Sequence, residues 1–297
     1  MSIRKKMAGS PVVAWVLENG GVILLSLIAD WIDDAKRESV MVVFLRTVAM
    51  STLSIDAVIL LQHLYNTLLY STKPFYGGAK RKANRNTFWW DYLTVHVPAR
   101  IVSAACLTQF IFHIEEDVYI ENTSRPFHLL HFLFKLFFTR IVSDVAFYFV
   151  HVLLHKIPFL YRNIHRTHHE HTYTTLVETN YRFHFLDLVL EGFIPVFVSF
   201  HLLNVIYDTT RITWFALTPM DVHLIAIYVN WYQIGSHSAQ LDVPTVTWYP
   251  PASVLTLCLF PNATDHVEFH STHHRKLRCN YGISTWLDKL LGTYRDP

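Results

Sequence analysis

Apolar residues in this chain are gathered into long, nearly continuous blocks, which predict membrane helices rather than the amphipathic elements of a water-soluble domain. The blocks cover residues 11–29, 40–62, 97–113, 127–155, 188–206 and 212–234. The block at 127–155 contains no glycine or proline, so we expect a single long helix there. At about 1.5 Å per residue it would be about 43 Å long and would extend beyond a hydrocarbon core of about 30 Å.

The last two blocks are separated only by the polar residues 207–211 and predict a helical hairpin. Pro219 and Asp221 interrupt its second arm, which favours a re-entrant hairpin over a spanning one. The expected fold class is all-α, a polytopic membrane helical bundle of about four spans plus a hairpin, capped by a cytosolic helical region. Residues 1–297 would form a single integral membrane domain, with spans mainly in 1–144 and the chemistry in 145–297.

The charge of the loops sets the expected orientation. Residues 71–96 are rich in lysine and arginine, so the positive-inside rule places this loop in the cytosol. Residues 114–125 are acidic and are expected in the lumen, where Asn122 begins a glycosylation sequon whose use we leave open. Residues 11–29 follow a short basic segment and are expected to be a retained signal anchor. Together these features predict a multi-pass protein of the endoplasmic reticulum membrane.

Composition agrees with a membrane protein and directs attention to histidine. Hydrophobic residues make up 52% of the chain and charged residues 16%, whereas soluble domains carry roughly 25% charged residues. The net charge of +2 is too small to indicate a nucleic-acid partner. The 3 cysteines have no CxxC spacing and predict neither a disulfide framework nor a thiolate metal site. The 19 histidines are the outlier.

Three histidine motifs lie in the second half of the chain. Their members are His151 and His155 (HxxxH), then His165, His168 and His169 (HxxHH), then His270, His273 and His274 (HxxHH). On a helix, positions i, i+3 and i+4 share a face, so each motif is expected to direct its imidazoles at one spot on the cytosolic side. Neutral imidazole is the commonest protein metal ligand, and this many suit two ions better than one. The alternatives are interfacial aromatics at a span end or a solvated basic face.

Further candidates lie close to these motifs. His237, at the exit of the hairpin, is expected to be another ligand. His184 and His266 are possible ligands, although His184 could instead be structural or lie behind a ligand. Asp187 and Glu191 could bind metal, or could accept the outer ring N–H that ligating histidines usually donate.

The spacing of these residues does not identify the metal. A donor set made almost entirely of imidazole suits Zn, Cu, Fe or Ni. Two irons at a membrane surface would suit oxygen chemistry on a lipid, and two zincs would suit hydrolysis or transport. Transporters place ionisable residues near the bilayer midplane, whereas these motifs lie at span ends and in loops, which counts against transport.

The order HxxxH, HxxHH, lone His, HxxHH resembles the fatty acid hydroxylase/sterol desaturase superfamily of membrane di-iron oxygenases. Residues 160–165 resemble that family's Leu-Tyr-Lys-x-x-His, and residues 280–293 resemble its closing sequence, a similarity that extends over 145–295. The chain departs from the family at His184-Phe-Leu-Asp187, where His-Pro-x-Glu is usual, and at Ser271, where Asp is common.

The resemblance implies two non-haem iron ions held by these histidines, with O2 as oxidant. Electrons would come from external NAD(P)H through cytochrome b5 and its reductase, since the chain has no His-Pro-Gly-Gly haem motif. Such a centre hydroxylates or desaturates a lipid, and we favour a sterol or related terpenoid because the compact chain is more similar to the sterol desaturase and methylsterol oxidase branch. The alternatives are a fatty acyl or sphingolipid hydroxylase of the same chemistry and, in another class, a non-redox zinc-binding membrane protein. The carbon oxidised and the oligomeric state stay open.

Overall fold

The computed structural model describes residues 39–49, 51–52, 90–119, 129–170, 177–237 and 263–296, and all regular structure in these ranges is helical. The elements are, in chain order, a helix at Val40–Ala49, η1 (Tyr92–His96), α5 (Val97–Tyr119), α6 (Leu129–Lys156), α7 (Pro158–Leu160), η2 (Tyr161–His165), η3 (His168–Glu170), η4 (Val177–Tyr181), α8 (Phe185–Asp187), η5 (Leu188–Phe193), α9 (Ile194–Thr210), η6 (Thr213–Phe215), α10 (Pro219–Ser236), α12 (Ala263–Lys276) and α13 (Thr285–Leu291). The all-α prediction is confirmed for these residues.

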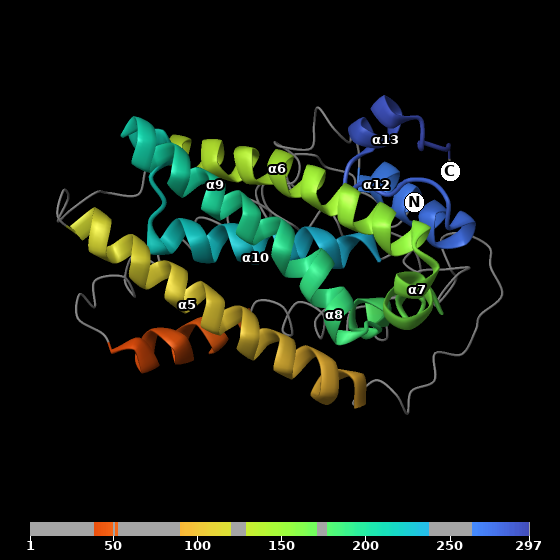
Figure 1. The fold of residues 1–297 in the computed structure, drawn as a ribbon, viewed down its shortest axis with the longest axis horizontal. Helices are drawn as coiled ribbons and strands as arrows, with labels where there is room; N and C mark the ends of the chain where they lie inside the picture. Colours follow the sequence, from red (N-terminus) through yellow and green to blue (C-terminus); the bar gives the residue numbers. More distant parts are fainter. Residues whose placement is uncertain are drawn as a thin grey trace, which may run out of the picture.

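The long helices α6 and α9 lie side by side and run antiparallel (Figure 1). Small polar residues meet where the two helices touch. The Oγ atoms of Ser143 and Ser199 are 2.9 Å apart, and the Ser199 hydroxyl also donates to the carbonyl of Pro195 at 2.8 Å. Small side chains of this kind allow two helix backbones to approach closely without leaving a polar group unsatisfied.

Helix α10 forms the centre of the bundle and packs against α5 and α6. Val222 and Ile225 of α10 are fully buried. The same apolar core includes Leu107 and Ile111 of α5, Phe132 and Leu136 of α6, and Val196, Phe200 and Leu203 of α9. The C-terminal ends of α6 and α10 lie at the same end of the bundle as α12, and each of these segments carries or adjoins histidines (Figure 1).

The outer faces of α6 and α9 are apolar as well. Phe149 and Leu153 of α6 are 53% and 51% exposed, and Val198 of α9 is 45% exposed. A helix that is apolar on both its inner and outer faces is typical of a membrane span. In the part of the chain that the structure describes, Leu130–Lys156 and Phe185–Thr210 are the two helical runs long and apolar enough to cross a membrane.

The hairpin differs from the prediction at its second arm. Helix α9 ends at Thr210, Arg211 has a left-handed backbone with φ 56°, and α10 starts only at Pro219. The side chain of Asp221 accepts from the backbone N–H of Thr218 at 2.9 Å, and the Thr218 hydroxyl accepts from the backbone N–H of Asp221 at 3.2 Å. This reciprocal pair is a capping box, and proline is favoured in the first helical turn. The predicted arm 212–234 is therefore helical as α10 only from Pro219 onward, and Pro219 and Asp221 lie in the first turn of that helix.

A buried ion pair closes the end of the bundle away from the histidines. The ammonium of Lys135 on α6 donates to the carboxylate of Asp221 and, at 2.8 Å, to the carbonyl of Ala216. Both charged side chains are almost completely buried. The pair satisfies two charges that would be costly in an apolar bundle if either stood alone, and it fixes α6 against the start of α10.

Two predicted loops are partly helical. Helix α5 continues to Tyr119, so the acidic stretch expected in the loop 114–125 is helical over its first residues. The last residues of the predicted loop 71–96 form η1, which leads directly into α5. Glutamate is a good helix former, which explains why acidity alone did not end α5. The predicted span at 11–29, most of the one at 40–62 and the sequon at Asn122 lie outside the described residues.

Candidate metal centre

The histidines predicted as ligands gather in two adjoining groups, which we call the five-histidine cluster and the four-histidine cluster. The five-histidine cluster consists of His151, His155, His165, His169 and His273, and the four-histidine cluster consists of His168, His237, His270 and His274. Within each cluster, one ring nitrogen from every member lies within 4.8 Å of those from all the others. The structure therefore brings together side chains that are more than a hundred positions apart in the sequence.

Each HxxHH motif is divided between the two clusters, which differs from the prediction that a motif points at one spot. Of the second motif, His165 and His169 join the five-histidine cluster, whereas His168 joins the four-histidine cluster. The third motif divides the other way, with His273 alone in the five-histidine cluster. Neighbouring residues on a helix point about 100° apart, so two adjacent histidines can serve two sites.

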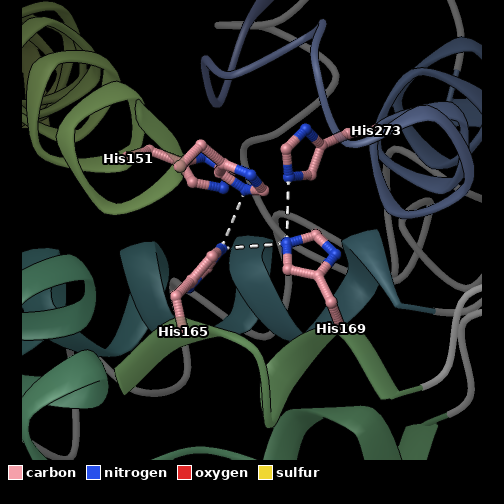
Figure 2. A group of neighbouring side chains, drawn as sticks. His151, His165, His169 and His273 are labelled. Carbon is pink, nitrogen blue, oxygen red and sulfur yellow. Dashed lines mark hydrogen bonds between the residues drawn. The ribbon is translucent and has the colours of Figure 1, made fainter. Parts of the chain in front are cut away.

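The five-histidine cluster has its inner nitrogens directed at a common centre. Figure 2 shows the rings of His151, His165, His169 and His273 converging from α6, η2, η3 and α12. The Nε2 atom of His165 lies 2.9 Å from that of His169 and 3.0 Å from that of His155. The Nε2 atoms of His273 and His169 are 3.2 Å apart. His155 is the one member that is not fully buried.

One loop between α12 and α13 holds the outer nitrogens of two of these rings. His151 Nδ1 donates to the carbonyl of Tyr281 at 2.7 Å, and His273 Nδ1 donates to the carbonyl of Cys279 at 2.7 Å. A carbonyl oxygen can only accept, so the proton of each neutral ring lies on Nδ1. The lone pair on Nε2 of both rings therefore points into the cluster, as in a metal-binding histidine.

Two buried carboxylates hold that loop in turn. Asp288 of α13 accepts from the backbone N–H of Tyr281 at 2.8 Å and of Gly282 at 2.7 Å. Asp144 of α6 accepts from the backbone N–H of Ile283 at 2.8 Å. It also accepts from the hydroxyl of Ser284 and the indole N–H of Trp286. The loop that orients two imidazoles is thus fastened to a candidate membrane span.

Two more carboxylates reach the five-histidine cluster directly, and both were singled out from the sequence. His165 Nδ1 lies 3.0 Å from each carboxylate oxygen of Asp187, which fixes the orientation of that ring. Glu191 follows one helical turn later, and its Oε1 atom lies 3.7 Å from His151 Nε2 and 3.8 Å from His165 Nδ1. Both carboxylates are buried.

The four-histidine cluster is drawn from η3, α12 and the residue that follows α10. The Nε2 atom of His270 lies 2.9 Å from that of His237 and 3.1 Å from that of His274. The Nε2 atoms of His237 and His168 are 3.4 Å apart. His237 Nδ1 lies 2.9 Å from the side-chain oxygen of Asn180, to which it donates. This outer contact is to a neutral amide.

The two clusters form one continuous region. The ring centroids of His169 and His274 are 4.5 Å apart, and those of His165 and His168 are 5.6 Å apart. Each of these pairs joins one member of the five-histidine cluster to one member of the four-histidine cluster. Two ions held here would be close neighbours served by adjacent side chains.

Burial keeps these imidazoles neutral. It lowers the pKa of His165, His168, His169 and His274 well below the usual 6.5, with neighbouring imidazoles adding to the effect. Burial also lowers the pKa of His273, to about 4, although its bond to the Cys279 carbonyl acts in the opposite direction. A neutral imidazole is the form that binds metal, so the rings are prepared for ligation near neutral pH.

The donor set fits two cations. Rings that donate through Nδ1 have bare Nε2 atoms, and bare nitrogen lone pairs about 3 Å apart repel unless a proton or a cation lies between them. Among the described residues, the buried Nε2 atom of His151 has no hydrogen-bond partner. One divalent cation in each cluster would satisfy these lone pairs.

Two further histidines that the sequence offered as possible metal ligands, His184 and His266, are not placed in either cluster by the described part of the structure. His184 is exposed and precedes α8, where its Nδ1 atom accepts from the backbone N–H of Leu186 at 3.2 Å. It belongs to neither cluster among the described residues. His266 lies in α12, one turn before His270, and its side chain is outside what the structure describes.

Apart from Asp187, the residues that orient the candidate ligands through their outer nitrogens, directly or through the loop 277–284, were not predicted from the sequence. Asn180 lies in a polar stretch without a recognisable pattern, so nothing in the sequence marked it. Asp144 did carry a signal, because a carboxylate within an apolar span is costly unless it has partners. Asp288 lies in the closing sequence that resembles the family, but the residues alone did not indicate what it binds.

Comparisons with known proteins identify a family match over the half of the chain that carries both clusters. Residues 136–293 match the family described as Fatty acid hydroxylase. Human cholesterol 25-hydroxylase is 30% identical over 175 residues, which cover 56% of this chain and 53% of that protein. Human fatty acid hydroxylase domain-containing protein 2 is 29% identical over 162 residues, covering 54% of this chain and 39% of that protein.

A plant relative extends the comparison to desaturases. The Delta(7)-sterol-C5(6)-desaturase of Nicotiana tabacum is 24% identical over 160 residues, covering 53% of this chain and 48% of that protein. The matched region therefore spans about half the length, or less, of these curated relatives. No solved structure matches the chain significantly.

Proposed function

The chain belongs to the fatty acid hydroxylase family, and from that premise we propose that it is a membrane-bound oxygenase that hydroxylates or desaturates a lipid. Its relatives include a sterol hydroxylase and a sterol desaturase, which are oxidoreductases. The observation that carries the proposal is the convergence of the histidine motifs and His237 into two adjoining clusters at one end of the bundle. Neutral imidazoles in this number and arrangement have little use other than metal binding.

We assign one iron ion to each cluster, with the clustered histidines as ligands. When bound, the pair of irons supplies the oxidising chemistry, using O2 to remove hydrogen from an unactivated C–H bond. The chain's own residues orient the imidazoles and exclude water. The Nδ1 bonds to Tyr281, Cys279, Asp187 and Asn180 keep the rings from rotating. Burial keeps the rings neutral and limits side reactions with water.

The lipid is expected to approach the five-histidine cluster beside His155. That residue and Tyr161 are both partly exposed, and their ring centroids are 5.4 Å apart. The chain next to them is apolar and outward-facing, since Ile157 and Phe159 are 41% and 68% exposed. A hydrophobic substrate in the bilayer could reach the cluster along this surface without passing through water.

For the membrane arrangement we propose what the sequence predicts. The chain would be a single integral membrane domain of about four spans plus a hairpin, with 1–144 contributing mainly spans and 145–297 the catalytic region. Loop charge supports a multi-pass protein of the endoplasmic reticulum with both clusters on the cytosolic side. That side would allow electrons to arrive from NAD(P)H through cytochrome b5 and its reductase.

The favoured substrate is a sterol or related terpenoid. The relatives named for cholesterol and for a sterol support this choice. A fatty acyl or sphingolipid substrate is the alternative within the same chemistry, because the relation to the sterol enzymes is distant. Zinc without redox activity is the alternative of another class, and metal analysis separates it from the oxygenase.

A reconstitution experiment tests the proposal. The full chain, purified into lipid nanodiscs from iron-supplemented cells, is expected to contain about two irons per chain. With NADH, cytochrome b5 and its reductase, it should consume O2 and convert a supplied sterol into an alcohol or an alkene, detected by mass spectrometry. Bound zinc with no O2 consumption would refute the oxygenase. If products formed from acyl lipids only, the oxygenase activity would be supported and the sterol substrate would be refuted.

A further inference from the structure

The two clusters differ in the negative charge available to them. Two divalent cations bring four positive charges, and neutral imidazoles cancel none of them. In the part of the chain that the structure describes, Asp187 and Glu191 form a group with His165, a member of the five-histidine cluster, and neither carboxylate is grouped with a member of the four-histidine cluster. The four-histidine cluster is approached by the neutral amide of Asn180 instead. Buried cations are strongly stabilised by an adjacent negative charge, so this asymmetry has chemical consequences.

Both oxygens of Asp187 are close to a ring nitrogen, whereas Oε1 of Glu191 has no hydrogen bond among the described residues. Both Asp187 oxygens lie 3.0 Å from Nδ1 of His165, the outer nitrogen of that ring. Glu191 is 5% exposed, and among the described residues its buried Oε1 atom has no hydrogen-bond partner. A buried carboxylate oxygen without a partner is costly, which indicates that something binds there.

The atom facing Glu191 is also without a partner. Oε1 lies 3.7 Å from Nε2 of His151, the inner nitrogen left bare when that ring donates to Tyr281. Two ligands held about 2.1 Å from one tetrahedral cation are about 3.4 Å apart. The observed distance is too long for a hydrogen bond and within a few tenths of an ångström of that separation.

The local backbone brings this carboxylate to the cluster. Glu191 lies in η5, a six-residue π-helical segment at Leu188–Phe193, and Asp187 lies four residues earlier at the end of α8. Both side chains project inward, because both residues are buried. Short π-helical segments within long helices are frequently found at functional sites.

We propose that Glu191 supplies an oxygen ligand to the ion in the five-histidine cluster, so that the two ions have different ligand shells. The first ion has imidazole nitrogens and one anionic oxygen, and the second has imidazole nitrogens alone. This inference rests on the proposed function, because it requires iron in both clusters. A hard anionic ligand favours the higher oxidation state, so the ion beside Glu191 would be the more easily oxidised of the two.

Mössbauer spectroscopy of the full chain loaded with iron-57 tests the assignment. Wild-type protein reduced under anaerobic conditions is expected to give two quadrupole doublets of about equal area, one from each ligand shell. Glu191→Gln removes the anionic oxygen with little change in volume, so one doublet should shift or disappear while the other is retained. The retained doublet and a monodisperse profile in detergent show that the variant is folded.

Two further variants separate a ligand from a counter-ion and from a general charge effect. Glu191→Asp keeps the charge but shortens the side chain by about 1.5 Å, so it should resemble Glu191→Gln if direct binding matters. Asp208→Asn removes an exposed carboxylate from the far end of the same candidate span and should leave both doublets unchanged.

The outcomes distinguish this inference from the proposed function. Two irons with an unchanged pair of doublets in Glu191→Gln would overturn the ligand assignment and leave the oxygenase intact. A wild-type spectrum from Glu191→Asp would also overturn it, because charge alone would then be sufficient. If Glu191→Gln lost both doublets together, the substitution would affect both ions, and the assignment of Glu191 to the ion in the five-histidine cluster alone would be refuted. Wild-type protein that binds no iron would overturn both proposals.

Discussion

The five-histidine and four-histidine clusters have the same ligand type but are supported differently. Outer nitrogens of the first are held by two backbone carbonyls of a single loop and by the carboxylate of Asp187. In the second, His237 has Asn180. Among the described residues, the buried outer nitrogens without a hydrogen-bond partner are that of His169 in the first cluster and those of His168 and His274 in the second. Ligands fixed from behind lose less freedom when a metal binds, so the five-histidine cluster should hold its ion more firmly.

The source of that support also differs. The loop behind the five-histidine cluster is fastened by Asp144 on α6 and Asp288 on α13, so its geometry depends on contacts between helices that are far apart in the sequence. Asn180 lies in the short segment η4, close in sequence to His184 and outside the long helices. A site supported by a candidate span and a site supported by a short turn should respond differently to mutation.

The largest expected effect comes from removing one ligand from either cluster. His273→Ala and His168→Ala, one in each cluster, should each reduce product formation by more than about 100-fold, because both ions would be needed to activate O2. Activity is measured in nanodiscs with reduced cytochrome b5, and membrane insertion by alkaline extraction should be unchanged. A fully active His273→Ala protein would contradict the ligand assignment.

Gly282→Ala should weaken iron binding at the five-histidine cluster and leave the four-histidine cluster unchanged. A Cβ at this position would lie 2.6 Å from the carbonyl oxygen of Ser284 and 3.0 Å from an oxygen of Asp288, so the loop must shift. The shift would move the carbonyls that orient His151 and His273, and we expect iron to be held about 10- to 100-fold more weakly at this cluster. Iron titration of the apoprotein measures this effect.

A nearby substitution serves as the control for Gly282→Ala. Leu290→Ala removes a side chain of α13 that is 71% exposed and should bind two irons as the wild type does. If Gly282→Ala also retained both irons with wild-type affinity, the loop would not be what orients the two imidazoles.

Asn180→Ala should produce the complementary change. It removes the acceptor of the His237 Nδ1 proton, so we expect about 10-fold weaker binding at the four-histidine cluster and little change at the other. The same iron titration, read through the separate Mössbauer doublets, assigns the loss to one cluster. Equal weakening at both clusters would mean that the two sites are not independently supported.

The smallest expected effect is kinetic and needs no mutation. With an excess of a ferrous chelator, one iron per chain should leave several-fold faster than the other, because fewer of the outer nitrogens in the four-histidine cluster are anchored. The time course of chelate absorbance measures the two rates. A single dissociation rate for both ions would contradict the proposed difference in how tightly the two clusters bind iron.

The helices and the ligand types were predictable from the sequence because both are local properties. The block at 127–155 was predicted as one helix, and α6 occupies Leu129–Lys156. The acidic end of α5 was misjudged, and Pro219 starts α10 within the predicted block 212–234, because acidic residues and proline can begin or extend a helix as well as end it. In the second case a capping box between Thr218 and Asp221 decided the boundary.

The sequence by itself determined that histidine motifs suited to metal binding would lie beside apolar helices, because periodicity and side-chain chemistry do not require knowledge of the fold. Only the tertiary structure decided which histidine belongs to which cluster. Spacing places His168 and His169 side by side, but their partners come from helices far away in the sequence. The same is true of Asp144, whose partners lie about 140 positions further on. Contacts between distant segments depend on how the helices pack, and the local pattern of residues does not contain that information.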